Sequence, residues 1–223
     1  MSSGSPSIST QSPHDQEPVV YVVDDDESMR VALGNLLRSA GLRVEAFESS
    51  RDFLAFPKYG APSCLILDVR LRGESGLAFQ EHIGKSEVHM PIVFMTGHGD
   101  IPMTVQAMKA GAVDFLAKPF RDQDMLDAVA NALALDAERL DAEKSIAALR
   151  VAYDTLTLRE REVMAFVVAG LMNKQIAAEM NLSVITVKIH RGHLMRKMAA
   201  RSVADLVRKS ELLGVKARSL KPC

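Results

Sequence analysis

Several polar residues of the kinds that carry out phosphoryl chemistry each follow a short apolar run in the first half of this chain. Asp24 and Asp25 follow the first run, Asp68 follows another, and Thr96 and Lys118 follow two more. Clustered carboxylates repel one another unless a cation lies among them. An oxygen-only cluster suits Mg²⁺, with Mn²⁺ as the alternative ion.

The residue types indicate transfer of a phosphoryl group to the protein itself. Asp68 is the candidate nucleophile, because a carboxylate with a free oxygen can attack phosphorus and form an aspartyl phosphate. Asp24 and Asp25 would hold the metal together with Asp68, and the backbone carbonyl of Arg70 would supply a further oxygen ligand. The hydroxyl of the threonine and the ammonium of the lysine would bind the phosphoryl oxygens.

The elements that must position these residues alternate between strand and helix patterns. Strand patterns occur at 19–23, 44–47, 64–67, 91–95 and 114–117, and helix patterns begin near residues 29, 52, 76 and 100. This alternation predicts an α/β doubly wound sheet of five parallel strands. Because the carboxyl ends of parallel strands meet at one edge of such a sheet, the polar residues are expected to converge there.

The rest of the chain is predicted to be helical. Residues 123–149 contain no Gly or Pro, and their apolar stripe of imperfect heptad spacing fits either a helix packed on its own domain or a paired coiled coil. Beyond Leu156, short helix patterns follow at 159–169, 173–180, 183–198 and 202–213. They predict a small all-α domain of four helices.

The charge of the chain is divided unevenly along its 223 residues, although the formal net charge is −1. Residues 155–223 carry 13 Lys and Arg against 5 Asp and Glu, whereas residues 1–154 carry 14 against 23. An acidic first part joined to a basic last part suggests two modules with different partners, the basic one a candidate for nucleic acid.

Composition also excludes several classes of protein and site. No stretch approaches the roughly 18 apolar residues of a membrane span, so no membrane partner is expected. The Ser- and Pro-rich start lacks the features of a signal peptide and reads as a disordered tail over residues 1–17. The two cysteines, Cys64 and Cys223, cannot build a disulfide framework or a Cys-rich zinc site, and they favour a reducing, cytoplasmic setting.

The helix pattern at 183–198 has the character of a DNA-recognition helix. Ser183 is the expected N-cap after a tight break, and the inward positions Val187, Leu194 and Met198 leave a basic outer face. On such a helix Lys188 could reach guanine acceptors in the major groove. A solvated amphipathic helix in a bundle is the alternative.

The runs VVDDDE, LILDVR, FMTGHGD and FLAKPF resemble the receiver domain of bacterial two-component response regulators over about residues 18–128. The resemblance implies a flavodoxin-like fold, phosphorylation of Asp68 by a sensor histidine kinase with Mg²⁺, and a cis bond between Lys118 and Pro119. It also implies a switch role for Phe115, whose alternative is a plain buried strand residue. The family often has Pro four residues after the nucleophile, where Arg72 would make the loop more mobile or add a cation near the phosphate.

The runs LTLREREV, NKQIA and TVKIHR resemble the LuxR-type helix-turn-helix domain over about residues 156–213. The combination resembles response regulators of the FixJ/NarL type, closest to the FixJ branch. It implies that Lys188 and Ile189 approach base edges. The further candidates for phosphate or nearby contacts are Asn173, Lys174, Thr186, Arg191, His193, Arg196 and Lys197. Gly192 departs from the family, which usually has a larger residue there.

We interpret the chain as a phosphorylation-activated transcription regulator of the bacterial cytoplasm. Its expected parts are a tail at 1–17, a receiver at 18–128, a linker helix at 129–154, a DNA-binding domain at 155–215 and a tail at 216–223. Phosphorylation would drive homodimerisation through the helix near 100–110 and the strand at 114–117, and the dimer would bind double-stranded promoter DNA. RNA polymerase is a further candidate partner.

The sequence leaves two other functions open. One is a DNA-binding regulator that works without phosphorylation. The other is a phosphohydrolase with an aspartate nucleophile, but such enzymes commonly place a second acid two residues after the nucleophile, where this chain has Arg70. The chain is therefore not expected to be an enzyme, beyond supporting its own phosphorylation and slow self-dephosphorylation.

Overall fold

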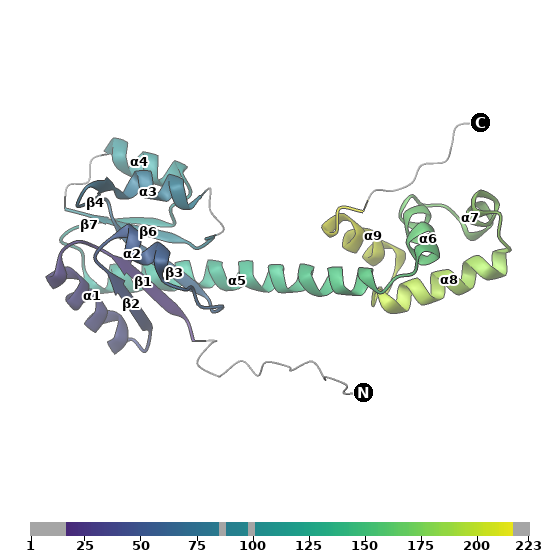
Figure 1. The fold of residues 1–223 in the computed structure, drawn as a ribbon, viewed down its shortest axis with the longest axis horizontal. Coiled ribbons are helices and arrows are strands. Elements are labelled where there is room, and N and C mark those ends of the chain that lie inside the picture. Colours follow the sequence, from purple (N-terminus) through teal and green to yellow (C-terminus); the bar gives the residue numbers. More distant parts are fainter. Residues whose placement is uncertain (1–16, 85–87, 98–100, 216–223) are drawn as a thin grey trace, which may run out of the picture. The chain divides into compact units, whose positions relative to one another are not determined.

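The computed structural model describes residues 17–84, 88–97 and 101–215. The chain divides into two compact units, residues 1–140 and 141–223 (Figure 1). Most of the expected N-terminal tail, the expected C-terminal tail and the first residue of the helix expected from 100 lie outside the described residues.

The first unit is built on a five-stranded parallel sheet in the order β2–β1–β3–β6–β7 (Figure 1). Its strands are β1 (Val19–Val23), β2 (Arg43–Phe47), β3 (Ser63–Asp68), β6 (Ile92–Thr96) and β7 (Asp114–Ala117). Its helices are α1 (Glu27–Ser39), α2 (Ser50–Ala55), α3 (Gly76–Ile83), α4 (Ile101–Lys109) and the first part of α5 (Asp122–Asp154). The predicted doubly wound fold is confirmed.

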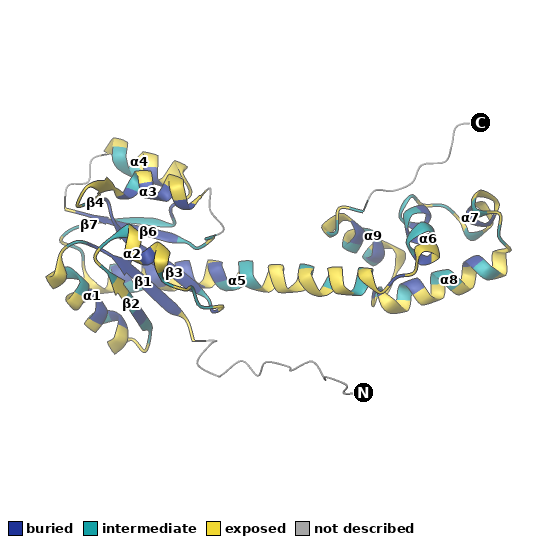
Figure 2. Ribbon diagram, in the orientation of Figure 1, coloured by how far each residue is buried: buried dark blue, intermediate teal, exposed yellow. Residues whose placement is uncertain are grey.

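Alternate residues of the strands build a hydrophobic core on each face of the sheet. Val20 and Val22 of β1 pack with residues of α1 and α5, whereas Val19, Tyr21 and Val23 pack with residues of α2, α3 and α4. Both faces are covered, so the central strands are buried throughout (Figure 2). This double burial explains why they read in the sequence as continuous apolar runs.

Helix α5 packs on the first unit over its first turns. Met125, Val129 and Leu133 are buried in the core, and the carboxylate of Asp136 accepts a hydrogen bond of 2.7 Å from the Ser63 N–H. Packing on its own domain is thus confirmed for this part of the helix. Residues 141–145 of the same helix are exposed.

The second unit contains helices α6 (Leu158–Val168), α7 (Asn173–Met180), α8 (Val184–Lys197) and α9 (Val203–Leu212) around one hydrophobic core. The predicted break between α7 and α8 is present. Asn181 adopts a left-handed conformation with φ of 53°, and the Ser183 hydroxyl caps α8 by accepting a bond from the Thr186 N–H at 3.0 Å. The all-α domain of four helices is confirmed.

One feature differs from the sequence-based prediction. The expected loop after β3 contains two short paired strands, β4 (Arg70–Leu71) and β5 (Glu74–Ser75), because Gly73 turns the chain with φ of +85°. The long helix predicted over 123–149 is present as α5, which ends five residues later, at Asp154. Among the described residues, none of the helices combines the length and apolar character needed to cross a membrane.

Candidate functional site

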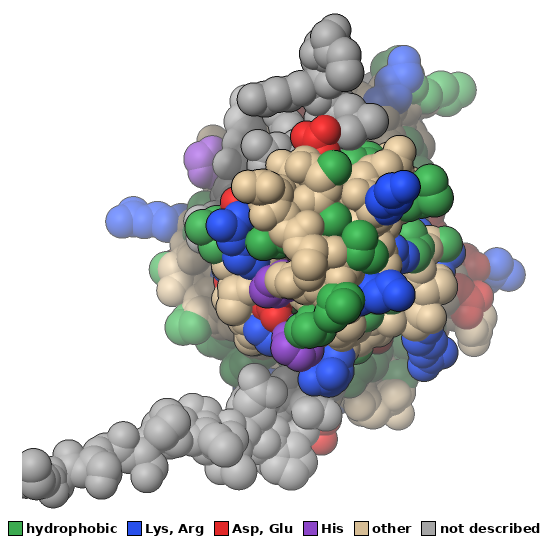
Figure 3. Space-filling model, turned by 90° about the vertical axis from the view of Figure 1, so that its right-hand side faces the viewer, with side chains coloured by type: hydrophobic (Ala, Val, Ile, Leu, Met, Phe, Trp, Pro, Cys, Tyr) green, Lys and Arg blue, Asp and Glu red, His purple; other side chains and the backbone are tan. Residues whose placement is uncertain are grey.

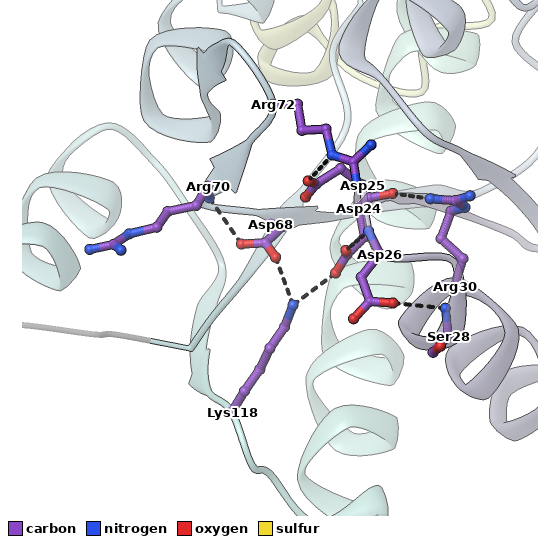
Figure 4. A network of polar contacts seen from close by, with 9 residues as sticks. All are labelled: Asp24, Asp25, Asp26, Ser28, Arg30, Asp68, Arg70, Arg72 and Lys118. Atoms are coloured by element: carbon purple, nitrogen blue, oxygen red, sulfur yellow. Dashed lines mark hydrogen bonds and ion pairs between the residues drawn. The ribbon is translucent and has the colours of Figure 1, made fainter.

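The acidic residues meet where β1 and β3 lie side by side. These strands pair in register up to Val23 and Leu67, so Asp24 and Asp68 leave the sheet at neighbouring positions. One oxygen from each carboxylate of Asp24, Asp25 and Asp68 lies within 4.8 Å of the others (Figure 4). The predicted convergence at the carboxyl edge of the sheet is therefore present, in an oxygen-only set that fits Mg²⁺ or Mn²⁺.

Lys118 bridges two of these carboxylates. Its ammonium nitrogen lies 2.8 Å from Asp24 Oδ2 and 2.7 Å from Asp68 Oδ2. Burial raises the pKa of Asp24 above its ordinary value, although the hydrogen bond from Lys118 acts in the opposite direction. Burial also disfavours the charged lysine, but its bonds to Asp24 and Asp68 outweigh that effect and raise the pKa of Lys118. The ammonium group therefore stays charged at neutral pH.

Backbone donors orient the same carboxylates. The Asp26 N–H donates to Asp24 Oδ1 at 2.8 Å, and the Arg70 N–H donates to Asp68 Oδ1 at 2.9 Å (Figure 4). Each carboxylate is thus held at one oxygen by the backbone and at the other by Lys118. Asp26 itself caps α1 by accepting a bond from the Ser28 N–H. A role for the Arg70 carbonyl as a metal ligand stays a prediction.

The other predicted residues of the site follow β6 and β7. Thr96 is fully buried at the end of β6, next to Met95, which is in register with Asp68. The N–H of Lys118 donates to the Thr96 carbonyl at 2.7 Å, and the Lys118–Pro119 bond is cis, as the resemblance implied. Phe115 is half-buried in β7, with its ring 6.2 Å from that of Phe94. Its switch role stays a prediction.

One residue of the site was missed in the sequence. A Cβ on Gly76 would lie 2.3 Å from the carbonyl oxygen of Asp68, so only glycine lets α3 begin so close to this strand. The sequence signal for it was a glycine at a helix start. Arg72, which the sequence offered as an added cation near the phosphate, forms an ion pair with Asp25, with 3.2 Å between Nε and Oδ2. Its partner was not predicted.

Cys64, the cysteine within the described residues, lies in β3 away from this chemistry. It is completely buried, and burial raises the pKa of its thiol to about 12. The thiol is therefore protonated and unreactive at neutral pH.

Helix α8 of the second unit presents a mixed basic and apolar surface. Lys188 is exposed beside two isoleucines, Ile185 and Ile189, which are 71% and 52% exposed. Figure 3 views the second unit from the end at which α7 and α8 lie in Figure 1, and Lys and Arg side chains are spread there among hydrophobic and His side chains. This composition suits contacts to phosphates and base edges.

The nine candidate DNA contacts are not equivalent. Lys174, Lys188, Ile189, His193, Arg196 and Lys197 are exposed, whereas Asn173, Thr186 and Arg191 are half-buried. Arg191 donates to the side-chain oxygen of Asn173 at 2.8 Å, which joins α8 to the start of α7. Lys197 donates to Glu160 Oε2 at 2.7 Å and to the Thr155 carbonyl at 3.0 Å. These internal bonds use two of the three N–H donors of the Lys197 ammonium.

Both units match known protein families. Residues 20–130 match the family described as the response regulator receiver domain, and residues 154–210 match the bacterial regulatory proteins of the luxR family.

Curated relatives match over most of their length. The chain is 57% identical over 199 residues to nodulation protein W of Bradyrhizobium diazoefficiens, a match that covers 89% of this chain and 88% of the relative. It is 40% identical over 193 residues to the transcriptional regulatory protein FixJ of Rhizobium meliloti, covering 85% of this chain and 93% of the relative.

Solved structures agree with these matches. A low-resolution structure of the response regulator StyR has a TM-score of 0.77 at 48% identity, and the match covers 87% of this chain and 98% of that one. Full-length FixJ from B. japonicum has a TM-score of 0.53 at 36% identity, with 89% and 98% covered.

Proposed function

This chain belongs to the response regulators and is a transcription regulator with a receiver domain and a LuxR-type DNA-binding domain, and we propose that phosphorylation of Asp68 controls its binding to promoter DNA. The proposed parts are the receiver at 18–128, the linker helix at 129–154 and the DNA-binding domain at 155–215. The setting that we propose is the bacterial cytoplasm, with RNA polymerase as a further candidate partner.

The proposed phosphoryl donor is a phosphohistidine of a sensor kinase. An oxygen of Asp68 attacks phosphorus, a new O–P bond forms, the N–P bond breaks and the imidazole leaves with a proton. Lys118 supports this role because its ammonium already pairs with Asp68 Oδ2. From that position it can donate a hydrogen bond to an oxygen of the incoming phosphoryl group. The buried Thr96, at the end of the neighbouring strand, is the proposed hydroxyl donor to another oxygen.

We propose Mg²⁺ as the cofactor of this step. Asp24, Asp25 and Asp68 would hold it through their carboxylates, and Arg70 through its backbone carbonyl. The observation in favour is the set of oxygens that lie within 4.8 Å of one another. When bound, the ion would offset negative charge on the transferring group and orient that group.

The proposed output is a homodimer that binds two DNA half-sites. Helix α4 exposes Ile101, Val105 and Met108, which are 81%, 44% and 44% exposed, and β7 follows it in the chain. An apolar helix face of this kind suits a partner surface. Phe115 of β7 is the proposed residue that links the phosphorylated pocket to this face. In each protomer α8 would enter the major groove.

The observation that supports this proposal most strongly is the position of Lys118. Its ammonium lies between Asp24 and Asp68, at hydrogen-bond distance from both. The test is the solution mass of the full chain by light scattering with Mg²⁺ and beryllofluoride, a mimic of the phosphoryl group. Wild type is expected to change from monomer to dimer, and Asp68→Asn to remain monomeric. Asp127→Asn is the matched control, an exposed aspartate of the same unit outside the pocket.

Each departure from this result has a defined meaning. A dimer of Asp68→Asn with the mimic would contradict control by Asp68. Equal promoter binding by wild type and Asp68→Asn, with and without the mimic, would favour a regulator that works without phosphorylation. Rapid turnover of a small phosphate ester by wild type alone would favour a phosphohydrolase.

A further inference from the structure

We propose that Arg72 is a resident counter-cation of Asp25, and that it must release this carboxylate when a divalent cation enters the pocket. Arg72 would therefore weaken metal binding and help to set the metal concentration at which the receiver works. The inference rests on the proposed function, since it takes the three carboxylates as the metal site.

The β4–β5 hairpin places Arg72 beside the pocket. Arg72 and Gly73 form the turn of this hairpin, which is closed by the pair Leu71 and Glu74, and Gly73 supplies the positive φ of +85°. Arg72 Nε then lies 3.2 Å from Asp25 Oδ2 (Figure 4). The carboxylate of Glu74 accepts a hydrogen bond from the Ser50 hydroxyl, so the hairpin is also tied to the start of α2. The turn is thus anchored on both sides.

Two cationic side chains form ion pairs with the three carboxylates of the pocket. Lys118 pairs with Asp24 and Asp68, and Arg72 pairs with Asp25. A divalent cation held by all three carboxylates needs an oxygen of Asp25. The guanidinium of Arg72 cannot lose its charge, because arginine does not deprotonate in proteins. It must therefore move away from the ion or share the carboxylate with it against electrostatic repulsion.

Arg72 has room to move. Its side chain is 77% exposed, whereas that of Asp25 is 23% exposed. Both residues line a cleft of about 330 Å³ between the hairpin and the start of α2, which also includes Arg51. The guanidinium can leave Asp25 for water without disturbing the core. When Arg72 releases Asp25, the only interaction lost is this ion pair, and ion pairs of exposed side chains are weak.

The expected effect on metal affinity is modest but measurable. Exposed ion pairs contribute less than about a factor of five to an equilibrium constant. Replacing Arg72 by Gln should therefore lower the dissociation constant for Mg²⁺ by about two- to fivefold. Arg51→Gln is the matched control, because it removes the same charge from the same cleft and leaves the pair between Arg72 and Asp25 intact.

The experiment is calorimetric titration of Mg²⁺ into the full-length wild type, Arg72→Gln and Arg51→Gln proteins. A lower dissociation constant for Arg72→Gln alone is the expected result. Equal constants for wild type and Arg72→Gln, or weaker binding by this variant, would overturn the inference. An equal gain in both variants would also overturn it, because the effect would then come from general charge and not from the contact with Asp25.

A second readout follows Arg72 directly. In wild type the NMR signal of the Arg72 Nε–H group should shift during the Mg²⁺ titration with the same midpoint as the calorimetric one. An Nε–H signal that does not respond would contradict the release of Asp25. Absence of Mg²⁺ binding in all three proteins would instead overturn the metal site of the proposed function, so the two failures are distinguishable.

Discussion

The two units each hold a lysine–carboxylate network, but the networks differ in how their charges are matched. In the first unit three clustered carboxylates are paired with Lys118 and Arg72. In the second unit the single carboxylate of Glu160 is met by the Lys197 ammonium at 2.7 Å, by the Thr157 N–H at 2.8 Å and by His193 Nδ1 at 3.7 Å. Negative charge is thus in excess in one network and fully matched in the other.

This difference separates a binding site from a structural joint. Carboxylates held together with excess negative charge repel one another. Such an unfavourable cluster is typical of a binding site, where a cation or another ligand offsets the repulsion. A buried carboxylate that is fully satisfied instead fixes the elements that supply its partners. Glu160 is 2% exposed and joins the start of α6 to the end of α8. Lys197 therefore joins α8 to α6 through its bond to Glu160, which is a structural role.

The largest expected effect concerns the lysine of each network. Lys118→Met should slow phosphorylation of Asp68 by a small-molecule phosphodonor about 100-fold or more, because it removes a charged donor aimed at the transferring group. Lys197→Met, the matched control, should leave the rate within about twofold. The measurement is the rate of phosphoprotein formation at saturating Mg²⁺. Equal losses in the two variants would contradict the separation of the networks.

The second prediction concerns the stability of the second unit. Glu160→Gln should destabilise it by about 1–3 kcal/mol, because the neutral amide leaves Lys197 without its charged partner and accepts weaker hydrogen bonds. Hydrogen exchange of the amides in α6 and α8 measures this change and keeps it apart from the first unit.

The control for this variant is Glu162→Gln, whose carboxylate pairs with the exposed Arg159 one turn away. Loss of such a surface pair should cost less than about 0.5 kcal/mol. If both variants accelerated exchange equally, Glu160 would have no special structural role.

The third prediction distinguishes the two lysines of α8 in DNA binding. Lys188→Ala should weaken binding to a target promoter about tenfold and reduce the preference for that promoter over an unrelated duplex, as expected for loss of one base contact. Lys197→Ala should weaken promoter binding less, because Glu160 and the Thr155 carbonyl already hold its ammonium. The measurement is the dissociation constant of each variant for both duplexes. An equal loss of promoter affinity in the two variants would show that Lys197 contacts DNA as strongly as Lys188 does.

Much of the first unit was predictable because its signals are local. The strands are buried on both faces and read as unbroken apolar runs, and Asp68 and Thr96 stand at their carboxyl ends. Parallel topology then brings these ends to one edge. The same logic predicted the break at Asn181 and the cap at Ser183.

The missed contacts depend on pairs that local patterns do not encode. Lys197 and Glu160 are 37 residues apart, and the pair between Arg72 and Asp25 depends on a hairpin that the sequence presented as a loop. Gly76 is required because α3 begins so close to the backbone of β3 that a Cβ would collide with it. That closeness depends on how the helix packs against the strand, which the local sequence does not encode. Charge and glycine content alone do not fix such long-range geometry.

The smallest expected effect is a pH dependence that sharpens the same comparison. Burial opposes ionisation of Glu160, but hydrogen bonds from Lys197 and the Thr157 N–H outweigh it and hold the pKa of Glu160 below its ordinary value. A carboxyl group with a lowered pKa in the folded state stabilises the fold fully above its unfolded value of about 4.3. That contribution is lost as the pH falls through the lower folded value.

The ¹³C signal of the Glu160 carboxyl group should therefore titrate below the ordinary range in wild type. Lys197→Met should raise the midpoint, because burial remains while the ammonium is gone. An unchanged midpoint would show that Lys197 does not hold this carboxylate in its charged form.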